Sequence, residues 1–111
     1  MRRPLLIDGT ILAGEDPQLS GGRMVRYEVG RGYDLKTIFE VPAAGAVTSE
    51  PVIAGDRLYF GTEDGSIYCV NKDTGEEIEK KKRVKGACRG IVPYGDGIIA
   101  LSDKGPVAAF A

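Results

Sequence analysis

Two pairs of neighbouring carboxylates, Glu15–Asp16 and Glu63–Asp64, are the first groups in this sequence that could do chemistry. Paired carboxylates can share the work of a general acid and a general base. These two pairs fall near corresponding turns of two similar segments, however, so turn formation explains them without catalysis. The chain has no His, and no Ser, Cys or Lys has a recognisable activating neighbour, so we expect no catalytic residue.

Two short motifs could bind a nucleotide or a metal ion. In GRGYDL, Leu35 stands where a dinucleotide-binding loop needs its third glycine, and no helical pattern follows it. In NKDTGEE, Asn71 and Asp73 alternate as calcium ligands do, but Gly75 stands at the next ligand position and no glutamate closes the loop. Asn and Asp side chains readily bond their own backbone, so this motif predicts a turn. We therefore expect no metal-binding and no cofactor-binding residues, and no cofactor.

A run of basic residues could contact phosphates: Lys80, Lys81, Lys82, Arg83 and Lys85. Lysine also protects an exposed strand edge against pairing with another chain, and this is the interpretation we favour. The segment around the run has only Ile78 and Val84 to bury, which predicts an exposed outer strand. Helix propensity alone would allow a helix here instead.

Charge and composition exclude several classes of partner. The 15 basic and 16 acidic side chains give a net charge of −1, so no strong field favours nucleic acid or an anionic membrane. No apolar run approaches the ~20 residues of a membrane helix, and Asp8 interrupts the region where a secretory signal would be apolar. We expect a cytoplasmic protein with neither a nucleic-acid nor a membrane partner. Cys69 and Cys88 are too few for a disulfide scaffold and match no zinc pattern, so we expect two small buried residues.

The segments that carry these motifs have the pattern of short strands. Gly (16) and Pro (6) interrupt almost every window long enough for a helical period. DRLYFGTED and GSIYCVNKD are rich in aromatic and branched residues and are bounded by turn signals, as strands are. Asp64–Gly65 is the strongest hairpin signal, and it predicts a two-residue turn. The sequence is therefore predicted to be all-β.

The strands recur as a repeat. PLLIDGTILAGED matches the segment that begins at Pro51 at an offset of about 47 residues, and YGDGIIALSDKGPVAAFA matches AGDRLYFGTEDGSIYCVN at an offset of about 40. Four strands per copy at this spacing are typical of a β-propeller blade. We predict one domain over 1–111, a partial propeller with three blades at roughly 1–44, 45–86 and 87–111. The third blade lacks its last strand.

The middle copy, PVIAGDRLYFGTEDGSIYCVNKDTGEE, resembles the blade repeat of the pyrroloquinoline-quinone-like (PQQ-like) propellers. Its second-strand apolar residues, its strand glycine Gly61, its Asp64–Gly65 turn, its third-strand Tyr68 and its Thr74–Gly75 turn all fall on the positions of that pattern. This family includes quinone-dependent alcohol and glucose dehydrogenases, a bacterial outer-membrane assembly lipoprotein, and propellers that only bind partners. The resemblance implies the propeller fold.

The departures from the family pattern concern the enzymes. The chain has no Trp, whereas the dehydrogenases dock one between adjacent blades, and it has no vicinal Cys–Cys pair. It also lacks the full set of blades that surrounds the quinone and its calcium ion. We therefore expect a non-enzymatic protein that acts as a protein–protein interaction or assembly subunit. The alternative is a fragment or remnant of a PQQ-dependent dehydrogenase that binds a quinone.

Three blades cannot close a ring, since propellers have about four to eight. An open arc leaves two apolar blade faces bare and ends on an apolar strand edge, for which we predict an interaction role: Val107, Ala108, Ala109 and Phe110. We expect a homo-oligomer, such as a dimer that closes a six-bladed ring, or a subunit of a larger complex. An excerpt of a longer propeller is the third alternative, although Met1 directly before the first blade favours a complete reading frame.

Overall fold

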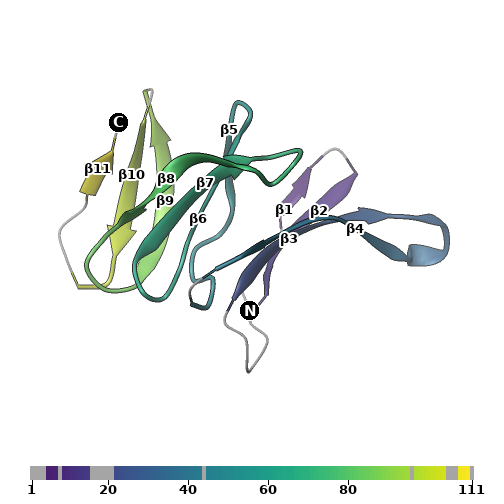
Figure 1. Ribbon diagram of the computed structural model, residues 1–111, viewed down its shortest axis with the longest axis horizontal. Helices are drawn as coiled ribbons and strands as arrows, with labels where there is room; N and C mark the ends of the chain where they lie inside the picture. The colour runs from purple at the N-terminus through teal and green to yellow at the C-terminus, as the bar shows by residue number, and fades with distance from the viewer. Residues whose placement is uncertain are drawn as a thin grey trace.

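The computed structural model describes residues 5–7, 9–15, 22–43, 45–95, 97–104 and 108–110, and it is built from three antiparallel sheets. The sheets follow one another along the molecule in chain order, from the purple and blue strands to the yellow ones (Figure 1). The all-β, propeller-like prediction is confirmed, including a third sheet that lacks a fourth strand among the described residues. No described segment forms a helix with the length and apolar character that crossing a bilayer would require.

The strand order is sequential in every sheet. The first sheet contains β1 (Leu5–Ile7), β2 (Thr10–Glu15), β3 (Arg23–Val29) and β4 (Leu35–Pro42), with a short 3-10 turn, η1 (Arg31–Tyr33), between the last two strands. The middle sheet contains β5 (Val52–Ala54), β6 (Arg57–Gly61), β7 (Ser66–Asn71) and β8 (Glu77–Arg83). The third sheet contains β9 (Cys88–Tyr94), β10 (Gly97–Ser102) and β11 (Ala108–Phe110).

The middle sheet buries both of its faces. We call the face that a sheet turns toward the preceding sheet its front, and the opposite face its back. Because side chains alternate along a strand, Leu58 and Phe60 of β6 lie on the front, in an apolar core shared with Leu12 and Met24 of the first sheet. Tyr59 between them lies on the back, in a second core shared with the third sheet. The chain thus has two sheet-on-sheet cores.

A buried arginine joins the first sheet to the middle sheet. The Arg26 side chain is only 7% exposed. Its Nε donates to Thr10 Oγ1 at 2.9 Å, and its Nη1 donates to the carbonyl oxygen of Lys72 and to Asp73 Oδ1, the latter at 3.2 Å. A charge this deeply buried needs such partners, so the contact fixes the first sheet against the turn after β7.

A carboxylate ties the end of β10 to the start of β9 in the third sheet. Asp103 Oδ1 accepts a hydrogen bond from the backbone N–H of Ala87 at 2.9 Å, and Oδ2 accepts one from Arg89 Nη2 at 3.1 Å. Desolvation by itself would raise the pKa of Asp103, but these two donors hold it below its usual value. Nearby, Thr48 Oγ1 donates to the carbonyl oxygen of Cys88 and ties the segment before β5 to the start of β9.

The turn between β6 and β7 differs from the two-residue hairpin expected from the sequence. Thr62 N donates to the Ser66 carbonyl oxygen and Gly65 N donates to the Thr62 carbonyl oxygen, both at 3.0 Å, so three residues form the loop. Gly65 has φ +87°, as the last position of this kind of loop requires. Asp64 Oδ1 also accepts bonds from the Thr62 hydroxyl and from Ser66 N, and these bonds favour the longer loop.

The segment with the basic run forms a strand, as preferred over a helix. β8 pairs antiparallel with β7 and is the outermost strand of the middle sheet. The turn before it confirms the interpretation of NKDTGEE: Asn71 Oδ1 accepts hydrogen bonds from Asp73 N at 2.8 Å and from Thr74 N at 3.1 Å. The Asn71 side chain is therefore engaged in holding its own turn.

Candidate functional site

The back of the third sheet is an exposed apolar surface. Strand pairing places Val92 opposite Ile99 and Tyr94 opposite Gly97, with Leu101 two residues further along β10, so all of these side chains share one face. Tyr94 is 73% exposed, Val92 48% and Leu101 39%. The opposite face of the same sheet carries Ile91, Ile98 and Ala100, which are buried in the second core. We call the apolar side chains of this face the back patch: Val92, Tyr94, Ile99 and Leu101.

The front of the first sheet is a partly exposed surface at the other end of the array, where Val25 is buried but Leu6 and Ile38 are open. Pairing places Leu6 opposite Ile11, and Ile11 opposite Tyr27, on the face that points away from the first core. Leu6 is 73% exposed and Ile38 of β4 is 40% exposed. Arg23 and Glu40 lie on this face and pair with each other at 3.2 Å. We call the apolar set the front patch: Leu6, Ile11, Tyr27 and Ile38.

One repeat position distinguishes the back of the third sheet from the backs of the other two. In β2 and β6 this position is glycine: a Cβ on Gly14 would lie 2.8 Å from Val47 Cγ1, and a Cβ on Gly61 would lie 2.3 Å from Cys88 Sγ. The next stretch of chain packs there at closer range than any side chain permits. At the corresponding position of β10 stands Leu101. The third sheet therefore presents a bulky side chain where its two predecessors present none.

The predicted interaction edge lies beside the back patch. Ala108, Ala109 and Phe110 form β11, which pairs with β10 and is the last strand of its sheet. Ala109 is exposed. Val107 lies outside the described residues. Within the described part of the chain no strand pairs with the other edge of β11, so the interaction role of this edge stays a prediction.

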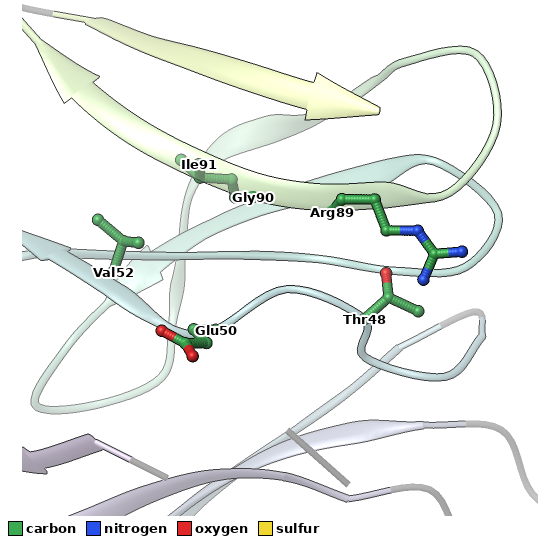
Figure 2. A pocket seen from close by; sticks show the side chains of 6 residues that line it. All are labelled: Thr48, Glu50, Val52, Arg89, Gly90 and Ile91. Carbon is green, nitrogen blue, oxygen red and sulfur yellow. The ribbon is translucent and has the colours of Figure 1, made fainter. Parts of the chain in front are cut away.

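A shallow pocket of about 200 Å³ lies between the segment before β5 and the strand β9. Figure 2 shows Arg89 and Thr48 on one side of it, and Val52 and Glu50 on the other. Its one basic group, Arg89, already pairs with Asp103. The pocket therefore presents a guanidinium whose charge is largely satisfied, a hydroxyl, a carboxylate and two apolar side chains, with no group activated for chemistry.

The remaining candidates for chemistry are structural. Cys69 and Cys88 are both buried, as expected, and both are free thiols. Burial raises the pKa of each, so neither is activated as a thiolate. Across the described residues, no three side chains of the Cys, Asp or Glu type converge as metal ligands would. Asp64 holds the β6–β7 turn, Asp16 lies outside the described residues, and the side chains of the Lys80–Arg83 run are likewise not described.

The sequence predicts bare blade faces, but it does not identify the residues that form the two patches. The signal was present in the repeat: Ile11 and Ile99 align with positions that are buried in the middle sheet. Leu101 aligns with Gly61, a large-for-small difference that marks the back of the third sheet. The strands beside them carry Leu6, Val92 and Tyr94, whose aligned residues in the middle sheet, Ile53, Val52 and Ala54, are only partly buried and so gave no comparable signal.

Comparison with known proteins agrees with this geometry. No family model matches the chain. Two curated relatives, the quinoprotein ethanol dehydrogenases of Pseudomonas putida and Pseudomonas aeruginosa, are each 42% identical to it over 41 residues, which is 37% of this chain and 7% of theirs. The chain thus spans a small fraction of the length of these relatives.

Solved structures extend the likeness to the whole fold. The computationally designed Ika4 protein superimposes on 96% of this chain and 62% of its own, with a TM-score of 0.77 and 13% identity. A europium-containing methanol dehydrogenase superimposes on 96% of this chain and 20% of its own, with a TM-score of 0.70 and 12% identity. The chain is a propeller-like array of sheets that shares a short stretch of sequence with quinoprotein dehydrogenases.

Proposed function

We propose that this chain is a non-catalytic assembly module of the quinoprotein-type propeller repeat. Its function is to complete a propeller by packing its front patch and its back patch against further blades. The observation that carries the proposal is that apolar side chains are exposed on the two outermost sheet faces, whereas both faces of the middle sheet are covered: Tyr59 is 5% exposed and Leu58 is fully buried, but Leu6, Tyr94 and Val92 are open to solvent. Contiguous exposed apolar surface of this kind marks interaction sites.

The electrostatics support the same function. The front patch carries one ion pair, Arg23–Glu40, and the other residues named for the two patches are uncharged. A covering blade would therefore bury little charge, which keeps the desolvation cost of association low. The free edge of β11 adds main-chain donors and acceptors that a further strand could pair with.

The experiment compares the wild-type chain with a variant that carries Leu6→Glu and Leu101→Glu. The proposal expects the wild-type chain to associate or to precipitate, and the variant, which has a like charge on both patches, to stay soluble near 11.8 kDa. Sedimentation velocity over a range of concentrations measures both. A wild-type chain that stays monomeric and as soluble as the variant would overturn the proposal.

The second candidate is a part of a quinone-dependent dehydrogenase, and the observation that favours it is the 41-residue similarity to the two ethanol dehydrogenases. It expects saturable binding of pyrroloquinoline quinone in the presence of calcium, measured by absorption titration of the purified chain. Unchanged quinone absorption at every protein concentration would count against it.

A further inference from the structure

The two patches are the unmatched halves of a contact that the chain already makes twice. The back of the first sheet packs on the front of the middle sheet, and the back of the middle sheet packs on the front of the third. The front patch and the back patch are the remaining front and the remaining back. They lie at opposite ends of the array (Figure 1), so within one copy of the described chain they do not meet each other.

We infer that the partner of this chain is a second copy of itself, with the front patch of each copy on the back patch of the other. The inference rests on the proposed function and names its partner. Two arcs of three sheets joined in this way form a closed ring of six sheets with two-fold symmetry, within the usual four to eight blades. Each joint continues the sheet-on-sheet packing already present inside the chain.

The residues at the proposed joint differ in size from those at the two internal joints. The back of the third sheet carries Leu101 where the other backs carry glycine. The front of the first sheet carries Ala13 where the front of the middle sheet carries the fully buried Phe60. At the two internal joints the glycine faces Val47 or Cys88, in the segment that leads into the next sheet, so Leu101 would have to be accommodated by the partner's chain beside its first sheet.

The test uses two single variants of the full chain, Leu6→Lys in the front patch and Leu101→Glu in the back patch. Each homodimer would contain two altered joints, each burying an unpaired charge, so each variant alone should dimerise at least about tenfold more weakly than the wild type. A mixed dimer has one unaltered joint and one joint with a lysine and a glutamate on opposite sides. Mixing the two variants should therefore restore a species of two chains, read by native mass spectrometry.

Ile78→Glu is the matched control, because Ile78 is an exposed apolar residue on the outer strand of the middle sheet and belongs to neither patch. It should leave the two-chain species unchanged. Urea unfolding of every variant verifies that each one folds.

Several results would overturn the inference. If Leu6→Lys alone still dimerises, the back patches associate with each other; if Leu101→Glu alone still dimerises, the front patches do. A mixture of the two variants that stays monomeric contradicts the packing of a front patch on a back patch. A wild-type chain that assembles only into larger species excludes the closed dimer, and one that assembles only with a different protein excludes a second copy as the partner; both leave the proposed function in place. A wild-type chain that stays soluble and monomeric at all concentrations would contradict both the inference and the proposed function.

Discussion

The middle sheet and the third sheet carry comparable residues at comparable repeat positions, but only the middle sheet is buried on both faces. In β6 the alternating side chains Leu58, Tyr59 and Phe60 are all at most 5% exposed. In β10 the corresponding Ile98 and Ala100 are buried, whereas Leu101 one step further is 39% exposed. The difference comes from the neighbours, since no described sheet packs behind the third one, and from Leu101, which stands where β6 has Gly61. A blade of this type is thus a unit with two contact faces, and an array of three leaves one such face open at each end.

The largest effect should come from truncating an aromatic residue inside a sheet-on-sheet core. Phe60 is fully buried and stacks on Tyr68 with ring centroids 4.8 Å apart. Phe60→Ala should lower the free energy of unfolding by about 3–5 kcal/mol, whereas Tyr94→Ala in the back patch should change it by about 0.5 kcal/mol or less in dilute, unassociated protein. Urea denaturation measures both. Equal costs would contradict the difference between inner and outer faces.

A smaller effect should come from adding one methyl group at the repeat position that separates the sheets. Gly61→Ala places a Cβ within 2.3 Å of Cys88 Sγ, so the third sheet must shift, at a cost of about 1–3 kcal/mol. Leu101→Ala at the corresponding position of the third sheet should change the stability of the dilute chain by about 0.5 kcal/mol or less. If Gly61→Ala lowers the free energy of unfolding as little as Leu101→Ala does, then Gly61 does not pack against Cys88 as closely as described. Urea denaturation measures both changes.

Much of this architecture could be predicted from the sequence, because the repeat fixes the number and the order of the strands. The strands around Leu58 and Ile98 were identified correctly, and so was the outer strand with the basic run. The three-residue loop at Asp64 was not, because its length depends on side-chain bonds from Asp64 to Thr62 and Ser66. The role of Arg26 could not be predicted either, since its partners Lys72 and Asp73 are distant in sequence and no local pattern connects them.

The smallest effect should be a pH dependence from Asp103, the carboxylate that ties the end of β10 to the start of β9. The pKa of Asp103 is held below its usual value, so its contribution to stability is present above that value and is lost as the pH falls through the lowered pKa. Asp103→Asn should therefore flatten the acid side of the stability curve. The exposed Asp56→Asn is the control, and stability is read by urea denaturation from neutral pH downward. The Arg26 contact also contains a carboxylate, Asp73, whose pKa is lowered by Lys72 and Arg26, so an acid dependence is expected there too. An acid slope that Asp103→Asn leaves unchanged would contradict a stabilising role for the Asp103 carboxylate.

The central claim is that the front patch and the back patch are covered by further blades in the assembled protein. The mass of the chain in solution tests this claim most directly. Light scattering on the purified 111-residue chain over a wide range of concentrations should show a limiting species of about 23.6 kDa, twice 11.8 kDa, that dissociates only on dilution. A chain that remains at 11.8 kDa at every concentration, soluble and with both patches open, would contradict the account.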